Sequence, residues 1–430
     1  LFVWVCCTAR VDAMPFNIGA DFKGTDLNAE FGVNPLSAGS IPPDTMGAVG
    51  PGHVAELLNG AYAVYDRNGN LQTRVGMVDF WNAAFTNSGA GTTANGPFDP
   101  RLLYDRHSSR WYAVAVDGAN STDNRLLVGV TTGDDPSLAN WHGFALDADT
   151  SDDRWADFPT LGIDGDGLYV SCNMFPVDGG GATSTLVNVY GVPKGSLLSP
   201  TPSIAGNVRV ENINPNNTGF SVQPAVDLGN SPLPLPALSD GDKPGGLIKR
   251  TDFPSDFFSS PAFGSPGGVI TVDARDAPPL AHQVGSSDNV DAGDTRFSGN
   301  VILQGGSMWG VQGVDENDRA AIEWYEIDLA TTSVIQNGLI ADPDLDMYYP
   351  SIGVNDLGDV VVGFTGSSDT VAMSSYVAVA GTTGGITTFG PITRLFEGNG
   401  SYQILDGNNR NRWGDYSATV LDPTAPRTFW

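Results

Sequence analysis

Short apolar runs separated by turn residues recur along the whole chain. Typical runs are four to eight residues long and rich in β-branched and aromatic residues, as at 126–132, 185–192, 268–274 and 376–381. Such runs are typical of β-strands. With 54 Gly and 29 Pro, the chain leaves few stretches long enough for a helix. The pattern therefore predicts an all-β protein.

One sequence phrase recurs almost position for position. ADFPTLGIDGDGLYVS at 156–171 and YYPSIGVNDLGDVVVG at 348–363 share Pro, a small hydroxyl residue, an aliphatic residue and Gly in the same order. We expect Gly162 and Gly353 to permit close backbone approach at a crowded inner strand. Asp164 should begin a turn, and the later glycines, Gly167 and Gly358, should supply its positive φ. The phrase therefore predicts a β-hairpin.

Weaker copies of the phrase extend the pattern over most of the chain. Taking the column of its proline as an anchor, seven copies align, at Asp44, Pro100, Pro159, Pro224, Gly310, Pro350 and Asp415. A repeat that fits four short strands plus loops favours a single β-propeller. We expect seven blades, with a truncated last blade. The proline-rich residues 231–256 should form a long surface insertion in the fourth blade.

The chain ends suggest further modules outside this sequence. Residues 1–13 are apolar and end in a small-x-small pattern, so we interpret them as the remnant of a secretory signal. Residues 14–40 carry no copy of the phrase and form an N-terminal extension, and 41–430 form the propeller. Without Cys6 and Cys7, Cys172 is alone, so no internal disulfide is expected. We expect a secreted or cell-surface protein that is truncated at both ends.

The charge balance excludes two classes of partner. The formal net charge is −28 at pH 7. Nucleic acids and anionic membrane surfaces repel such a field, so neither is expected to bind. No stretch after the N-terminal segment has the ~18 apolar residues of a spanning helix. We therefore expect no membrane insertion.

Several phrases carry a resemblance to known proteins. DFPTLGID, MYYPSIGVN, AIEWYEIDLATTSVIQNGLI and NRWGDYSATVLDP resemble segments of large secreted bacterial proteins that carry an N-terminal β-propeller ahead of other surface modules. The resemblance spans about residues 40 to 430 and implies a propeller without a shared activity. The architecture is also distantly similar to sialidase-type propellers, although their Asp-box, Ser-x-Asp-x-Gly-x-x-Trp, is absent.

The candidate site follows from the fold. Loops leading into the first strands of a propeller open on one face near the axis, so residues before the anchors should converge there. As ligand-binding residues we predict Asp99, Arg101, Gln223, Trp309, Tyr348, Arg412 and Trp413. If the site is catalytic, its residues should be Asp44, Asp157, Asp415 and Tyr349. Carboxylates, arginines and aromatic rings together are typical of carbohydrate sites. The alternative is structural: the aspartates brace their loops and the tryptophans pack between blades.

Acidic loops raise a second chemistry. Oxygen side chains at alternate positions can present several ligands to Ca²⁺. The candidate calcium ligands are Asp147, Asp149, Asp152, Asp342, Asp344 and Asp346. As solvated turns, these loops need no metal. None completes an EF-hand.

Three functions remain open at this point. The favoured one is an extracellular propeller that binds a polysaccharide or another surface ligand, because no catalytic motif stands out against the repeat. The alternatives are a glycan-active hydrolase or lyase on the same face, and a scaffold for protein partners. A fold alone does not separate them.

Overall fold

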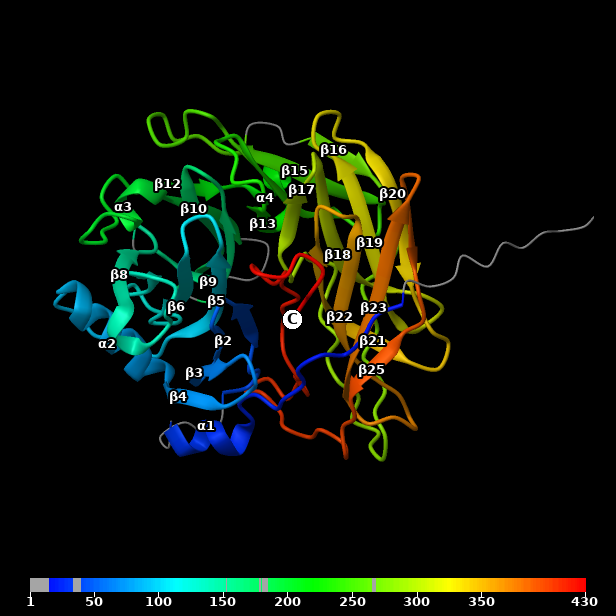
Figure 1. Cartoon of the computed structure of the whole chain (residues 1–430). Coiled ribbons are helices and arrows are strands. Elements are labelled where there is room, and N and C mark those ends of the chain that lie inside the picture. Colours follow the sequence, from blue (N-terminus) through cyan, green and yellow to red (C-terminus); the bar gives the residue numbers. More distant parts are fainter. Residues whose placement is uncertain (1–14, 34–39, 152, 178, 180–184, 265–267) are drawn as a thin grey trace, which may run out of the picture.

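The computed structural model describes residues 15–33, 40–151, 153–177, 179, 185–264 and 268–430. The predicted signal remnant, 1–13, lies outside them. The strands pair antiparallel with their sequence neighbours into four-stranded units. Figure 1 shows these units placed around the C-terminal segment, which is drawn in red near the centre.

The first three units occupy the N-terminal half of the chain. Unit 1 consists of β1 (Met46–Val49), β2 (His53–Leu58), β3 (Ala61–Asp66) and β4 (Leu71–Gly76). Unit 2 consists of β5 (Phe98–Asp105), β6 (Arg110–Asp117), β7 (Arg125–Thr131) and β8 (Trp141–Asp147). Unit 3 consists of β9 (Arg154–Ile163), β10 (Gly167–Pro176), β11 (Leu186–Pro193) and β12 (Val208–Ile213).

The remaining units follow the same order of strands. Unit 4 consists of β13 (Phe220–Asp227), β14 (Leu235–Asp242), β15 (Leu247–Phe253) and β16 (Gly268–Thr271). Unit 5 consists of β17 (Val301–Gln304), β18 (Ser307–Asp315), β19 (Ala320–Asp328) and β20 (Val334–Ile340). Unit 6 consists of β21 (Asp346–Val354), β22 (Asp359–Ser367), β23 (Ser374–Thr383), β24 (Ile386–Phe389) and β25 (Thr393–Phe396), which also pairs with β23.

First strands of neighbouring units meet side by side at the centre. Val226 on β13 pairs in parallel with Ile163 on β9, and Ala225 pairs in parallel with Val301 on β17. A Cβ on Gly162 would stand 2.5 Å from the carbonyl oxygen of Ala225, so the expected close approach is confirmed there. This arrangement of four-stranded units around a centre is a β-propeller, as the repeat predicted.

The C-terminal segment lies between the sixth and first units. Ser417 Oγ donates to the carbonyl oxygen of Tyr349 in unit 6 at 2.7 Å. Arg67, in the turn after β3 of unit 1, forms an ion pair with Asp422. Within this segment the pairing is limited to isolated bridges, such as Leu421 with Phe429. The described residues thus hold five four-stranded units, a sixth unit of five strands and a C-terminal strap, and the count of seven blades stays a prediction.

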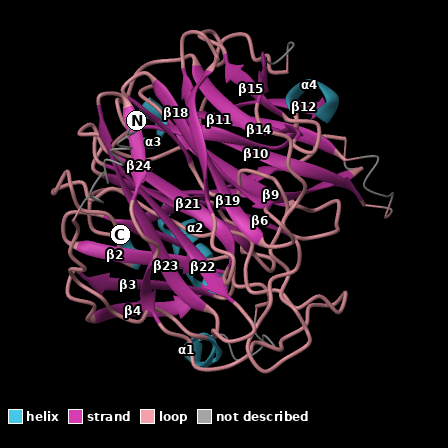
Figure 2. Cartoon of the chain, turned by 90° about the vertical axis from the view of Figure 1, so that its right-hand side faces the viewer, coloured by secondary structure: helices cyan, strands magenta, loops and turns pink. Residues whose placement is uncertain are grey.

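Figure 2 shows few helices among the many strands, and the sequence pattern predicted none of them. α2 (Met77–Ser88) packs Phe80 and Trp81, both fully buried, against Trp141 of unit 2. The others are α1 (Leu27–Val33), the 3₁₀ turn η1 (Leu138–Asn140), α3 (Lys194–Leu197) and α4 (Pro215–Thr218). Among the described residues, no helix is both long and apolar enough to cross a membrane.

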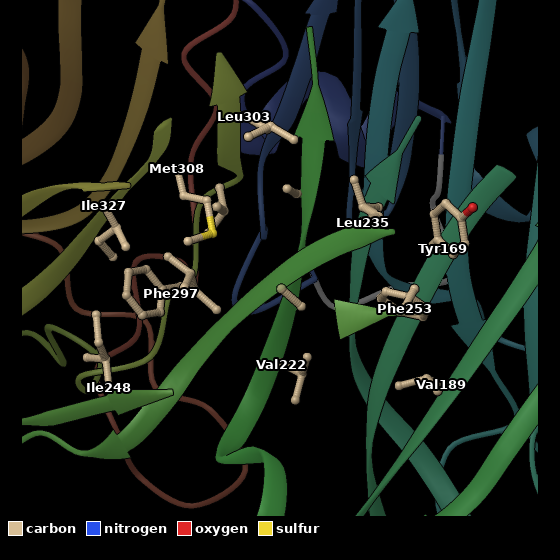
Figure 3. Close-up of a cluster of buried hydrophobic side chains, with 14 of the residues drawn as sticks. Tyr169, Val189, Val222, Leu235, Ile248, Phe253, Phe297, Leu303, Met308 and Ile327 are labelled. Atoms are coloured by element: carbon tan, nitrogen blue, oxygen red, sulfur yellow. The ribbon is translucent and has the colours of Figure 1, made fainter. Parts of the chain in front are cut away.

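The predicted insertion at 231–256 is wrong. These residues contain β14 and β15, and Figure 3 shows Leu235 and Phe253 within a buried apolar cluster. The prolines are tolerated because Pro234 and Pro236 lie beyond the last pairing with β13, which joins Ala237 to Pro224. The long irregular connection is instead 272–300, between β16 and β17.

The fifth anchor and one glycine were also assigned wrongly. Gly310 lies on β18, the second strand of unit 5. The sequence pattern did not reveal the first strand, β17, because it is only four residues long and carries no glycine. Gly358 has the expected positive φ of 82°, but Gly167 does not adopt a positive φ. The space that a Cβ of Gly167 would fill is taken by Phe258 and Tyr169. Asp164 begins its turn as expected, accepting from the backbone N–H of Asp166 and Gly167.

Candidate functional site at the propeller axis

A β-bulge at the same place in four first strands shapes the site. In unit 2, Phe98 pairs with Val116 and Arg101 with Val114, so one residue is extra on β5. Asp99 in this bulge has φ 51°. Bulges of this kind re-aim side chains and are common next to functional sites. The equivalent bulge residues with positive φ are Phe158, Ser221 and Tyr349.

Three aspartates from three units form a hydrogen-bonded row, which we call the carboxyl row. Asp99 shares side-chain hydrogen bonds with Asp44 and Asp157, and accepts from Phe158 N–H at 3.0 Å. Asp44 in turn accepts from Asn59 Nδ2 at 2.8 Å. A hydrogen bond between two carboxyl groups needs a proton on one of them. The carboxyl row is therefore protonated in part.

Burial and charge act in the same direction on this row. Desolvation raises the pKa of all three acids, and raises those of Asp44 and Asp157 well above the ordinary range. The charge of Asp415 raises the pKa of Asp44 further, and the charge of Asp99 raises that of Asp157 further. Asp44 and Asp99 are buried, whereas Asp157 is half-buried. Of the three, Asp157 is therefore the carboxyl most open to solvent.

A buried arginine lies beside the row. Arg101 is fully buried and donates to the carbonyl oxygens of Pro159, at 2.8 Å, and Ser298, at 2.7 Å. Its guanidinium stacks 3.6 Å from the ring of Tyr416 in the C-terminal strap. Nη2 has no hydrogen-bond partner among the described residues. One side chain thus ties units 2, 3 and 5 and the strap together.

A polar pocket of about 250 Å³ opens above this layer. Three acids and three arginines line it together with aromatic residues; the charged residues are Asp291, Asp294, Asp415, Arg296, Arg410 and Arg412. Arg412 forms an ion pair with Asp415, and Arg296 forms one with Asp294 at 2.6 Å. The lining therefore carries balanced charge, with N–H donors beside carboxylate acceptors.

The connection 272–300 supplies one wall of the pocket. Tyr349 donates from its hydroxyl to the carbonyl oxygen of Asp291 at 2.7 Å. At the other end of the wall, buried Asp346 accepts from His282 Nδ1 at 2.8 Å and from Arg319 Nη1 at 2.8 Å. Charge-assisted bonds to a buried carboxylate are strong. The wall is thus fixed to unit 6 at both ends.

The structure brings most of the predicted site residues together at the axis. Asp44, Asp99, Asp157 and Asp415 interact electrostatically with one another, and Asp415, Tyr349 and Arg412 line the pocket. Trp413 is exposed beside Tyr402, at 5.1 Å between ring centroids. The role of the predicted site residues in binding or catalysis stays a prediction.

Of the seven predicted ligand-binding residues, Arg412 lines the pocket and six do not: Asp99, Arg101 and Trp413, described above, and Trp309, Tyr348 and Gln223. Trp309 is buried against Trp324 in the core of units 5 and 6, because its strand is second in its unit. Tyr348 is fully buried and shares a hydrogen bond with Ser367 Oγ at 2.9 Å. Gln223 is fully buried and donates to backbone oxygens of the inner strands.

The sequence reasoning missed the contribution of 291–298. These residues directly precede β17, so a correct first strand for unit 5 would have pointed to Asp294 and Arg296. The signal was weak because β17 lacks the glycine and proline of the phrase. Arg410 was missed because it precedes a C-terminal segment without regular strands.

Among the residues that the structure describes, no cluster of three acid, His or Cys side chains suited to a metal is present, and calcium binding by the acidic loops stays a prediction. Asp149 accepts from Ser151 Oγ and from the backbone N–H of Arg154, so it braces its own turn. Asp342 accepts from the N–H of Asp344 in the same way, and Asp147 from that of Asp149. Asp346 is buried and accepts from His282 and Arg319, and its assignment as a calcium ligand stays a prediction. Asp152 lies outside the described residues.

No family model matches the chain, and no curated protein matches it. Solved structures match at low similarity. They include an endo-arabinase from Bacteroides thetaiotaomicron VPI-5482, at 13% identity over 71% of this chain and 95% of that chain, with a TM-score of 0.35. An exo-1,5-α-L-arabinanase from a bovine ruminal metagenomic library is 11% identical over 81% of this chain and 96% of that chain, with a TM-score of 0.36. An α-L-arabinofuranosidase from Lactobacillus brevis is 11% identical over 70% of this chain and 95% of that chain, with a TM-score of 0.38.

All three are named as glycan-active enzymes. At these TM-scores the likeness carries no argument about what this chain does. The resemblance to secreted multi-module propellers stays a prediction, since no family model places the chain.

Proposed function

We propose that the axial pocket binds a glycan of neutral sugars, as part of a secreted or cell-surface protein. The observation that carries the proposal is the paired charge of the lining: Arg412 with Asp415, and Arg296 with Asp294. A sugar hydroxyl both donates and accepts. A wall that alternates N–H donors with carboxylate acceptors satisfies it in both roles.

The charge balance also selects against anionic ligands. Because the arginines are neutralised by neighbouring aspartates, the pocket offers a uronate or a sulfate no excess of positive charge. The formal net charge of −28 further repels acidic polymers at a distance. A neutral glycan needs no excess of positive charge in the pocket and is not repelled by the net charge of the chain.

The size of the pocket limits how much of a glycan enters it. Its volume of about 250 Å³ is slightly below that of typical ligand pockets, which span roughly 300–1,000 Å³. We therefore expect it to take one or two sugar rings, such as a chain end or a side branch. Exposed Trp413, next in sequence to Arg412, offers a flat face for a further ring.

The proposal is tested by measuring retention of the full chain on neutral and acidic polysaccharides, with and without a chelator. We expect at least one neutral polysaccharide to retain the chain, and we do not expect retention by acidic polysaccharides alone. Arg412→Gln should weaken that binding about 10- to 100-fold, the loss of one charge-assisted hydrogen bond. Arg394→Gln is the matched control, since Arg394 is an exposed arginine of unit 6 paired with Glu397. Retention of acidic polymers alone, or equal weakening by both variants, would contradict the proposal.

A further inference from the structure

We propose that Lys194 forms an intramolecular isopeptide bond with the side chain of Asn230, and that Asp105 accepts the proton that the lysine must lose. The three side chains come from three units of the propeller. Asp105 ends β5 of unit 2, Lys194 directly follows β11 of unit 3, and Asn230 lies in the turn after β13 of unit 4. None of them lines the axial pocket, so the inference is independent of glycan binding.

The ammonium group of Lys194 lies among three oxygen atoms. Nζ is 2.6 Å from Asn230 Oδ1, 2.8 Å from Asp105 Oδ2 and 2.7 Å from the carbonyl oxygen of Asp164. Since a C=O bond is about 1.2 Å long, the amide carbon Cγ of Asn230 lies within about 3.8 Å of Nζ. Reactive groups held this close in a fixed geometry react as though at very high concentration.

Asp105 is placed to accept a proton from Lys194. The side chains of Lys194 and Asp105 are only 6% and 7% exposed. Burial raises the pKa of Asp105, but its bonds to Lys194 and Ser108 lower it more, so the carboxyl group is ionised. It also accepts from Ser108 Oγ at 2.6 Å and from His107 N–H at 3.0 Å. An adjacent base is what makes a lysine amine a nucleophile, and this base is held by bonds that outlast the ammonium.

The turn that carries Asn230 is fixed by its backbone. Asn230 has φ 54°, and Asp227 accepts from Gly229 N–H at 2.8 Å and from Ser231 N–H at 2.6 Å. The carbonyl oxygen of Ser231 accepts from Gly165 N–H at 2.8 Å, which ties the turn to unit 3. The electrophile is therefore held in place before any bond forms. Because Asn230 is only half-buried, ammonia can leave to solvent.

A second buried lysine shows what distinguishes this site. Lys243 is fully buried and lies 2.7 Å from Glu323 Oε2, and its Nζ also donates to the carbonyl oxygen of Asp273. Among the described residues, no side-chain amide oxygen accepts from Lys243. Lys243 thus forms an ordinary buried ion pair, whereas Lys194 contacts a base and an electrophile together.

The reaction consumes only the two side chains that it joins. A proton passes from the Lys194 ammonium to Asp105, and the freed lone pair of Nζ attacks Cγ of Asn230. As the bond from Cγ to Nδ2 breaks, Nδ2 takes up the proton from Asp105 and a second proton from Nζ. The products are the Lys194–Asn230 amide and one ammonium ion. Atoms and charge balance without an oxidant or a co-reactant.

The test is mass spectrometry of the denatured and reduced full chain and of its tryptic peptides. We expect wild type to be lighter than its sequence mass by one ammonia. Its digest should contain a branched peptide that joins Lys194 to Asn230, with no cleavage after Lys194. Asn230→Ala and Asp105→Asn should each have the full sequence mass and be cleaved there. Unlinked wild-type peptides, cleaved after Lys194, would overturn the proposal whether or not the variants fold.

Asn317→Ala is the matched control. Asn317 is an exposed turn residue whose φ of 57° is close to that of Asn230, so its replacement should keep both the loss of ammonia and the branched peptide. A succinimide at an Asn-Gly sequence, such as Asn399–Gly400, also releases ammonia. A mass loss that maps to such a sequence, with no branched peptide, would overturn the proposal.

Discussion

Asp157, on the first strand of unit 3, shares a side-chain hydrogen bond with Asp99 on the first strand of unit 2. The two residues are 58 positions apart in the chain but occupy adjacent places beside their β-bulges. Asp44 makes the same contact from unit 1. The propeller thus assembles, from three units, a row of acids whose pKa values are all raised by burial.

The first prediction concerns the pH dependence of stability. The unfolded chain ionises its aspartates near pH 4, whereas Asp44 and Asp157 stay protonated in the fold because their pKa is raised. These two groups therefore stabilise the fold fully below pH 4 and lose that contribution as pH rises towards their folded pKa values. Asp44→Asn removes this loss, and its amide can still donate to Asp99.

We expect the free energy of unfolding of Asp44→Asn to match wild type near pH 4 and to exceed it increasingly up to pH 8. Urea unfolding at several pH values measures this. A variant that is less stable than wild type at pH 8 would show that Asp44 is ionised in the fold.

The second prediction concerns the acceptor of the row. Asp99→Asn removes the charge that favours protons on Asp44 and Asp157, so the pKa of both should fall. It also replaces an acceptor oxygen by an N–H₂ group that faces two donors, which should cost about 1–3 kcal/mol. Infrared spectroscopy of protonated carboxyl groups at pH 7 checks the first effect, since the band should weaken. An unchanged band would place the protons elsewhere.

The third prediction concerns the buried arginine. Arg101→Met keeps much of the side-chain volume but leaves the carbonyl oxygens of Pro159 and Ser298 without their donor, and removes the stacking on Tyr416. We expect a loss of about 3–5 kcal/mol in urea unfolding, as for the breaking of a buried ion pair. Arg394→Met, at an exposed ion pair, should cost less than about 1 kcal/mol. Similar losses in both variants would contradict a central role for Arg101.

The fourth prediction concerns the wall of the pocket. Asp346→Asn weakens the bonds from His282 and Arg319, so amide hydrogen exchange should become faster across 281–291 and glycan affinity should fall several-fold. Asp344→Asn, two residues earlier and exposed, should leave exchange in the wall unchanged. Unchanged exchange in Asp346→Asn would show that the wall is held by other contacts.

The sequence predicted the parts of this molecule that depend on local pattern. Alternating apolar runs predicted the strands, and the repeated phrase predicted that Asp44, Asp99, Asp157 and Asp415 lie at one face. The turn at Asp164 and the close approach at Gly162 follow from residue chemistry alone.

The remaining features depend on tertiary packing. Helix α2 forms because Phe80 and Trp81 find a buried surface beside Trp141, which no local pattern reveals. Arg296 and Asp294 lie in an irregular segment whose place is set by contacts such as His282 with Asp346. The protonation of the row depends on the distance between units, which a linear sequence does not contain.

The central claim, a glycan site at the axis, is tested most directly by a crystal structure of the full chain with an oligosaccharide of the neutral glycan it retains. The account predicts a sugar ring between the Arg412–Asp415 and Arg296–Asp294 pairs, with hydroxyl groups bonded to both. An oligosaccharide bound only at the outer strands, with the axial pocket empty at saturating concentration, would contradict it.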